Sequence, residues 1–191
     1  MSLGDAAMTS PVDWLHERLL VLRCQAGDPL AFEELVLLYQ PRLRYFLRAM
    51  LRGDRDVDDR LQEIWLDVHR GIARLSDPAA FVSWLYRIAR NRALRALRKR
   101  QEPPRSLDGI DLPAKEDEET RWSAEDAEYV HAALDSLEPE HREVLLLRFI
   151  EEMSYEHIAS VTGCPVGTVR SRLHYAKRAL RCVLERMNPH D

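Results

Sequence analysis

Apolar side chains recur at helical spacing along nearly the whole of this 191-residue chain. The first three stripes are Phe32, Leu35, Val36 and Tyr39; Leu43, Phe46, Leu47 and Met50; and Val57, Leu61, Ile64, Trp65 and Val68. Spacings of three and four residues place each stripe on one face of a helix, and no segment has the alternation typical of a strand. Asp28-Pro29 and Asp77-Pro78 are helix starts, because each puts a capping carboxylate before a proline. The sequence therefore predicts an all-α fold.

A segment rich in proline and acidic residues, 102–122, interrupts this pattern and is typical of a flexible linker. We expect two small helical domains, at 13–101 and 123–187, with a disordered start at 1–12 and a short tail at 188–191. Fully extended, the linker spans roughly 70 Å. That is about two turns of B-DNA at roughly 34 Å each, so the two domains are expected to be able to contact separate DNA sites.

The composition argues against several classes of protein. With 46% hydrophobic and 31% charged residues, the chain has the balance of a soluble globular protein, and we find neither a signal-peptide pattern nor a membrane-spanning run. The three cysteines, Cys24, Cys164 and Cys182, form no Cys-x-x-Cys pair. This favours the reducing cytoplasm over a disulfide scaffold or a zinc site. Because nucleotide-binding glycine motifs and nucleophile–base pairings are missing, we expect no cofactor, no metal and no enzymatic activity.

Charge is strongly segregated along the chain, although the net charge is only −4. Residues 87–100 hold seven Lys or Arg and no acid, and residues 165–184 hold five and no acid. Residues 116–128 hold seven acids against one Arg. Local charge of this kind predicts two basic surfaces despite the acidic total.

The C-terminal residues have the pattern of a helix-turn-helix: a short helix capped by Ser154, a turn at Gly163 and a long basic helix opening at Pro165. Winding the last helix at about 100° per residue gives it three faces. The inward residues are Val169, Leu173, Ala176 and Leu180; the outward ones are Gly167, Ser171, His174, Tyr175 and Arg178; Arg170, Lys177 and Arg181 lie on one flank. Early positions are suited to base edges and later cations to phosphates, although a helix face can also be basic only for solubility. Arg172, at the edge of the inward face, is expected to pack against the core or to pair with an acid such as Glu156.

Residues 81–92 interleave aromatic side chains with arginine, a combination that binds single-stranded DNA through stacking and phosphate attraction. Aromatic residues at helical spacing are more often part of a core. We assign Phe81, Leu85 and Ile88 to the core and leave Trp84 and Tyr86 open between the two roles.

The C-terminal motifs resemble region 4 of the extracytoplasmic-function (ECF) sigma factors over about 127–185. The matching segments are Leu137-Glu138-Pro139, Arg142-Glu143-Val144-Leu145-Leu146-Leu147-Arg148, Ser154-Tyr155-Glu156-His157-Ile158-Ala159 and Gly167-Thr168-Val169-Arg170-Ser171-Arg172-Leu173. The resemblance implies that this module reads the minus-35 promoter element and docks on the flap of the polymerase beta subunit. The implied DNA contacts are Gly167, Thr168, Arg170, Ser171, His174, Tyr175, Lys177 and Arg178.

The N-terminal module resembles sigma region 2 over about 27–100. The matching segments include Ala31-Phe32-Glu33-Glu34-Leu35, Asp59-Arg60-Leu61-Gln62-Glu63 and Trp84-Leu85-Tyr86-Arg87-Ile88-Ala89-Arg90-Asn91. The resemblance implies that the last helix and the loop before it open and read the minus-10 element. The implied DNA contacts are Arg74, Ser76, Trp84, Arg87, Arg90, Asn91, Arg92, Arg95 and Arg98. Asp59, Gln62, Glu63 and Trp65 are implied to bind the clamp helices of the beta-prime subunit, although a polar helix face can also be merely solvated.

The sequence therefore favours an ECF sigma factor of the sigma-70 family, with core RNA polymerase, promoter DNA and an anti-sigma factor or other regulator as partners. Two alternatives remain at this point. One is a free-standing helix-turn-helix regulator with an N-terminal sensing or dimerisation bundle. The other is a helical adaptor whose basic faces bind an acidic protein.

Overall fold

The computed structural model describes residues 11–53, 56–101 and 132–187, and all the regular structure in these ranges is helical. The predicted all-α class is confirmed. The predicted linker 102–122 and tail 188–191 lie outside the described residues, as do 1–10 of the predicted disordered start. The first helix begins at Pro11, slightly before the predicted boundary at 13.

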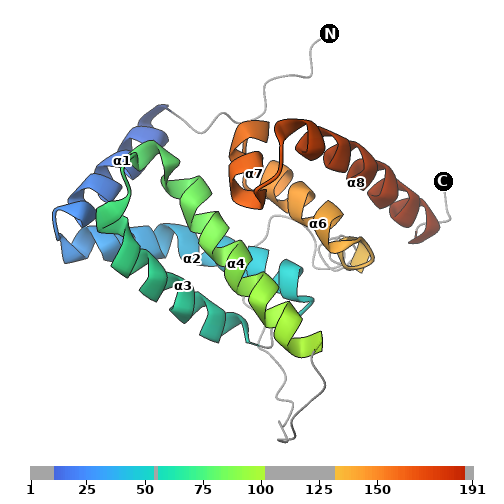
Figure 1. Cartoon of the computed structure of the whole chain (residues 1–191), viewed down its shortest axis with the longest axis horizontal. Coiled ribbons are helices and arrows are strands. Elements are labelled where there is room, and N and C mark those ends of the chain that lie inside the picture. The colour runs from blue at the N-terminus through green and yellow to red at the C-terminus, as the bar shows by residue number, and fades with distance from the viewer. Residues whose placement is uncertain (1–10, 54–55, 102–131, 188–191) are drawn as a thin grey trace, which may run out of the picture.

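The N-terminal module is a bundle of helices α1 (Pro11–Gln25), α2 (Pro29–Leu51), α3 (Val57–Gly71) and α4 (Phe81–Gln101), as shown in Figure 1. Two short 3-10 turns, η1 (Ile72–Arg74) and η2 (Pro78–Ala80), connect α3 to α4. The Asp28 carboxylate accepts hydrogen bonds from the backbone N–H groups of Leu30 and Ala31, and the Asp77 carboxylate accepts one from Ala79. Both predicted helix starts are therefore confirmed.

The C-terminal module contains α6 (Pro139–Leu145), a π-helical turn η3 (Leu146–Ile150), α7 (Tyr155–Thr162) and α8 (Val166–Met187). The Ser154 hydroxyl accepts a hydrogen bond from the His157 N–H, which caps α7. Gly163 ends α7 with φ at 70°, in the left-handed region that favours glycine. Because α8 follows at once, α7 and α8 form the predicted helix-turn-helix.

The predicted apolar stripes form the core of each module. Leu35, Leu43 and Ile64 are fully buried in the first module, and Val169 and Leu173 are buried in the second. The two aromatic residues whose role the sequence left open, Tyr86 and Trp84, differ in burial. Tyr86 is fully buried and packs edge-on against Phe46, with ring centroids 5.3 Å apart, whereas Trp84 is half-buried.

The two modules pack directly against each other, which the sequence did not predict. Helix α7 packs on α4, and α6 packs on α2 (Figure 1). Buried residues of both modules belong to one contiguous hydrophobic cluster. None of the helices in the described part of the chain combines the length and apolar character that crossing a membrane requires.

Arg142 of α6 links the modules through a guanidinium group that is 1% exposed. Its Nη1 donates to the carbonyl oxygen of Ala49 in α2 at 2.8 Å. Its other nitrogens donate to carbonyl oxygens of the residues before α6: Leu134 at 2.8 Å, Leu137 at 3.0 Å and Asp135 at 3.1 Å. Ala49 lies in the last turn of α2, where helix carbonyls lack intrahelical partners. The cation therefore caps this helix end as well as ordering its own module.

We predict that Arg142→Ala lowers the free energy of unfolding by about 3–5 kcal/mol, because it leaves several buried carbonyl groups without donors and opens a cavity. Arg142→Lys should retain only part of the lost free energy of unfolding, since an ammonium group cannot reproduce the planar set of donors of a guanidinium group. Urea denaturation measures both changes. The exposed Arg70→Ala is the matched control, expected within about 0.5 kcal/mol of wild type. Equal stability of Arg142→Ala and this control would contradict the assigned role.

A second prediction concerns Gly71, the last residue of α3. A Cβ atom at this position would lie 2.7 Å from Cζ2 of Trp84. Gly71→Ala should therefore displace the indole ring and cost about 1–3 kcal/mol. Combination with Trp84→Phe should cost less than the sum of the two single changes, as a double-mutant cycle of urea unfolding would measure. Gly167→Ala has no atom within 4 Å of the added Cβ and should not destabilise the protein; a similar loss in both alanine variants would argue against the steric explanation.

Candidate nucleic-acid interface

The outer face of α8 is open to solvent where the sequence predicted it. Ser171, His174 and Arg178 are exposed, and Tyr175 is 57% exposed. The flank residues Arg170 and Lys177 are exposed as well, whereas Thr168 is half-buried. His174, Lys177, Arg178 and Arg181 line a basic hollow on this helix. The inward stripe anchors α8, so its charged face points away from the core.

Arg172 does not lie on this outer face. Its Nη2 forms an ion pair with Oε2 of Glu140 at 2.6 Å, and its Nη1 lies 3.9 Å from Sγ of Cys164. The prediction that Arg172 pairs with an acid is confirmed, but the acid comes from α6 and not from α7. Arg172 therefore helps to hold α8 on α6.

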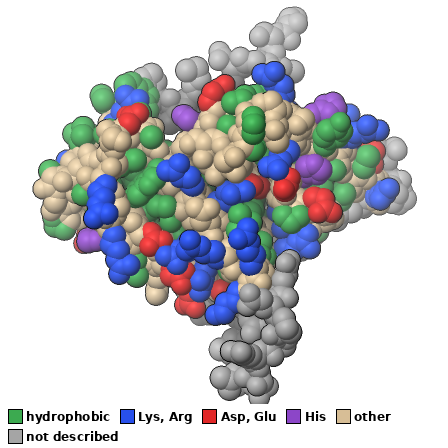
Figure 2. Space-filling view, in the orientation of Figure 1, with side chains coloured by type: hydrophobic (Ala, Val, Ile, Leu, Met, Phe, Trp, Pro, Cys, Tyr) green, Lys and Arg blue, Asp and Glu red, His purple; other side chains and the backbone are tan. Residues whose placement is uncertain are grey.

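The second basic surface follows α4. Arg87, Asn91, Arg95 and Arg98 are exposed along this helix, and Arg74 and Ser76 are exposed in the turn before it. Figure 2 shows Lys and Arg side chains spread over the face of the molecule that α4 crosses, with acidic side chains among them. The structure thus brings the predicted minus-10 residues of the loop and helix into one module.

Two arginines predicted to contact the minus-10 element are already engaged within the protein. Arg92 binds Oδ2 of Asp67, with Nη2 at 2.5 Å and Nε at 2.8 Å, and its Nη1 lies 3.1 Å from Oε2 of Glu63. Arg90 donates from Nε to Oε1 of Glu143 at 2.5 Å. Arg92 therefore ties α4 to α3, and Arg90 ties α4 to α6.

Two of the four predicted polymerase-binding residues, Gln62 and Trp65, line a groove of about 720 Å³ between α2 and α3, whereas Asp59 and Glu63 do not. Asp59 and Gln62 are exposed, Glu63 is half-buried in its pairs with Arg60 and Arg92, and Trp65 is only 9% exposed. The Trp65 ring packs edge-on against Phe32, with centroids 6.0 Å apart. Trp65 therefore forms a wall of the groove.

Leu66 also lines this groove and was missed by the sequence reading. It is 54% exposed, because it falls one position beyond the inward stripe of α3. The sequence does carry a signal for this position: Leu66 is a large apolar residue that lies outside the inward stripe of α3.

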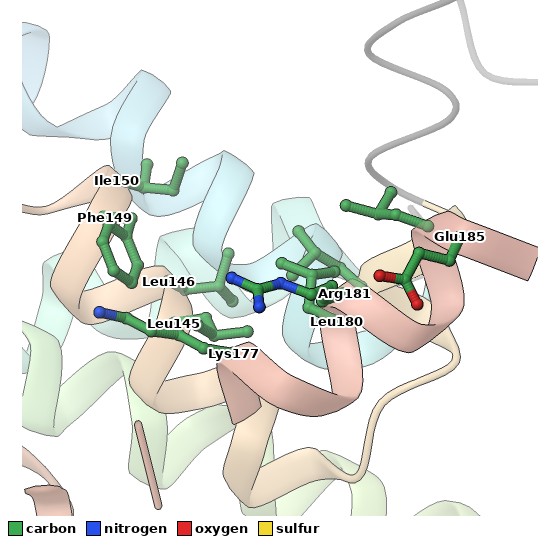
Figure 3. Close-up of a pocket in the computed structure, with 10 residues that line it drawn as sticks. Leu145, Leu146, Phe149, Ile150, Lys177, Leu180, Arg181 and Glu185 are labelled. Atoms are coloured by element: carbon green, nitrogen blue, oxygen red, sulfur yellow. The ribbon is translucent and has the colours of Figure 1, made fainter. Parts of the chain in front are cut away.

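A second groove, of about 530 Å³, was also missed. Phe149 and Ile150 at the end of η3 and Lys177, Leu180 and Arg181 of α8 line it, with Glu185 further along α8 (Figure 3). Phe149 is 53% exposed, and the Lys177 ammonium lies 5.0 Å from the centre of its ring. Phe149 and Ile150 are the last residues of a nearly continuous apolar segment, and such a segment predicts a buried core. Both residues instead lie at the end of the π-helical turn and are exposed.

Family models match both modules. The model for "Sigma-70 region 2" matches residues 35–102, and that for "Sigma-70, region 4" matches residues 127–180. Each match falls in the module in which the corresponding motifs were recognised, although the region 2 match does not include α1. A free-standing regulator is therefore not favoured, because such a protein has no need of a sigma region 2.

Curated relatives match over nearly their whole length. The chain is 34% identical over 182 residues to the RNA polymerase sigma-H factor of Pseudomonas aeruginosa, with 89% of this chain and 94% of that protein covered. It is also 34% identical to the ECF RNA polymerase sigma-E factor of Escherichia coli K12, with 87% and 93% covered.

Solved structures of sigma factors resemble the fold of both modules. CnrH, determined in complex with the cytosolic domain of CnrY, superposes with a TM-score of 0.68 at 26% identity, covering 89% of this chain and 97% of that one. RpoE of Bartonella quintana, determined with the anti-sigma factor NepR, gives a TM-score of 0.66 at 26% identity, covering 81% and 96%. Together with the relatives, these matches show that the chain belongs to the ECF sigma factors, transcription initiation factors that direct RNA polymerase to promoters.

Proposed function

We propose that the outer face of α8 reads the minus-35 element and that α4, with the turn before it, reads the minus-10 element. One observation carries this assignment. In α8 the stretch from Val166 to Leu184 contains no acid, the inward residues Val169, Leu173 and Ala176 are buried, and the basic outer face is exposed. A recognition helix presents such a face to the major groove.

Position along α8 divides the residues by role. Gly167, Thr168, Arg170 and Ser171 lie in its first turns, from which a recognition helix contacts base edges. Lys177 and Arg178 lie further along, where cations meet phosphates. His174 and Tyr175 lie between the two groups and are exposed. This supports base reading by the first group and phosphate binding by the second.

On α4, the exposed residues Arg87, Asn91, Arg95 and Arg98 are the proposed strand contacts, and Arg74 and Ser76 border the site of base extraction. Extracting a base costs a few kcal/mol, which stacking and hydrogen bonds to its exposed edge recover. Trp84 is half-buried against Gly71 and is the proposed aromatic wall. Arg90 becomes available only if it leaves Glu143, and Arg92 acts mainly by orienting α4.

The two grooves are the proposed polymerase contacts. The groove between α2 and α3 has apolar walls and a polar rim that includes Gln62 and Asp58, as expected for a surface that binds the beta-prime clamp helices. The groove between η3 and α8 is more apolar and suits the beta flap. Because RNA polymerase works in the cytoplasm, we assign the protein to that compartment, and an anti-sigma factor is a further proposed partner.

In vitro transcription tests the proposal directly. Core polymerase is incubated with fragmented genomic DNA, with and without this chain, and the start sites are sequenced. We expect a set of start sites that appears only with the chain and shares two sequence elements upstream. Unchanged start sites would contradict the proposed function.

For α8 we predict that Arg178→Ala weakens every promoter alike and lowers the slope of log affinity against log salt by about 1, because one phosphate contact is lost. Ser171→Ala should instead change the ranking of minus-35 variants, by about 1–3 kcal/mol at one base pair. Reconstituted holoenzyme binding to a promoter library at several salt concentrations measures both effects. Arg186 is exposed near the end of α8, and Arg186→Ala is the control. It should change neither the salt slope nor the ranking of minus-35 variants.

For the polymerase surface we predict that Leu66→Glu lowers affinity for core polymerase about tenfold or more, because it puts a charge into an apolar contact. Leu37→Glu is the matched control, since Leu37 is 76% exposed on α2 and does not line the groove. Fluorescence anisotropy of the labelled chain titrated with core polymerase measures the affinities. Equal affinities of the two variants would exclude this groove as the contact.

A further inference from the structure

Gln25, the last residue of α1, reaches across to the turn before α4. Its side-chain nitrogen Nε2 lies 2.7 Å from the carbonyl oxygen of Leu75 and 3.0 Å from that of Ile72, which are 50 and 47 residues further along the chain. The two N–H groups of one primary amide can serve two acceptors at once. Helix α1 also packs on η1 and η2, the two 3-10 turns of this segment (Figure 1). Gln25 therefore joins α1 to the backbone of the turn.

The end of α1 that carries Gln25 is itself held against α2. Nη2 of Arg23 lies 2.7 Å from Oδ2 of Asp28, and Nη1 of Arg23 lies 3.4 Å from Oε1 of Glu34. The same Asp28 carboxylate caps the first turn of α2. Leu20, one turn earlier in α1, is fully buried. The amide of Gln25 therefore extends from a fixed point of the bundle.

The backbone of the turn is held in two places, and the side chains between them stay free. In its first half, Gln25 binds carbonyl oxygens on both sides of Arg74. In its second half, the Asp77 carboxylate caps η2. Arg74 and Ser76 lie between these points, and both are exposed. A backbone that is fixed in advance loses less conformational freedom when its side chains bind a ligand.

We propose that Gln25 is a positioning residue for minus-10 recognition, which acts without touching DNA by fixing the turn that carries Arg74 and Ser76. Without its two donors the turn samples other conformations, and the fraction that can accept an extracted base falls. Helix α1 precedes residues 35–102, which the region 2 model matches. The assignment therefore adds a segment outside the matched residues to the minus-10 site. It rests on the proposed function of the turn, whereas the hydrogen bonds themselves do not.

Amide hydrogen exchange of the full chain, measured by mass spectrometry, tests the positioning without DNA. Gln25→Glu keeps the shape of the side chain but replaces the donor nitrogen by an oxygen, and Gln25→Ala removes both hydrogen bonds. We expect the peptide that covers residues 72–77 to exchange about tenfold faster in both variants, because two hydrogen bonds that order it are lost. Exchange in α2 should stay as in the wild type, and circular dichroism checks that each variant is folded.

Base extraction is measured with holoenzyme and a promoter fragment, recovered in the transcription assay, that carries 2-aminopurine in its minus-10 element. The fluorescence of this base analogue rises when the base leaves the stack. We expect both Gln25 variants to slow the rise about tenfold, because fewer molecules have the turn in the competent conformation. Their affinity for core polymerase should stay as in the wild type.

Val57→Ala is the matched control for lost stability. Val57 is buried at the start of α3, whereas the turn follows the end of that helix. This variant should lower the free energy of unfolding, as urea denaturation measures, and leave the fluorescence rise unchanged. An equal slowing in Val57→Ala and Gln25→Ala would overturn the positioning role, because lost stability alone would then explain it.

The two measurements separate the parts of the inference. Unchanged exchange of residues 72–77 in both Gln25 variants would overturn the positioning of the turn. Faster exchange with an unchanged fluorescence rise would overturn the role of Gln25 in minus-10 recognition alone. Absence of any fluorescence rise with the wild-type chain would instead reject the proposed function, and the exchange measurement would still decide whether Gln25 positions the turn.

Discussion

The buried guanidinium of Arg142 is the interaction on which the packing of the two modules depends. Removing a cation from water costs several kcal/mol, and the group is retained because carbonyl oxygens of two different segments accept its hydrogen bonds. One of these segments is the buried last turn of α2, where helix carbonyls lack partners within the helix. A neutral side chain of the same size could fill the space but could not satisfy these acceptors. A single residue of α6 therefore caps a helix of the other module.

Ion pairs across the same interface give it a different character from the cores of the two modules. The cores are held by apolar packing, which tolerates no separation without a large loss of buried area. The interface adds ion pairs to its apolar contacts, and the net contribution of such pairs to stability is modest, because water solvates the same charges when they are exposed.

The exposed faces of α8 and α4 are consequences of how each helix is anchored. Helix α8 is anchored by a stripe of small and branched residues, so Gly167, Arg170 and Ser171 face solvent, whereas Thr168 and Arg172 are half-buried. Helix α4 is anchored on several sides, by the apolar stripe, by Arg92 to Asp67 and by Arg90 to Glu143. Its arginines are therefore divided between holding the fold and facing outward, which net charge along the helix does not reveal.

The sequence by itself determined the helices, their caps, the two modules, the helix-turn-helix and the family, because these depend on local spacing and on short motifs. Val169 and Leu173 face inward and Ser171 and His174 face outward, as winding the helix predicts. Only the tertiary structure decided that Arg90 pairs with Glu143, that Arg142 caps α2 and that Phe149 faces a groove. Each of these depends on residues far apart in the chain or on the π-helical turn at η3, and periodicity within one helix carries no information about which distant side chain its exposed charges meet.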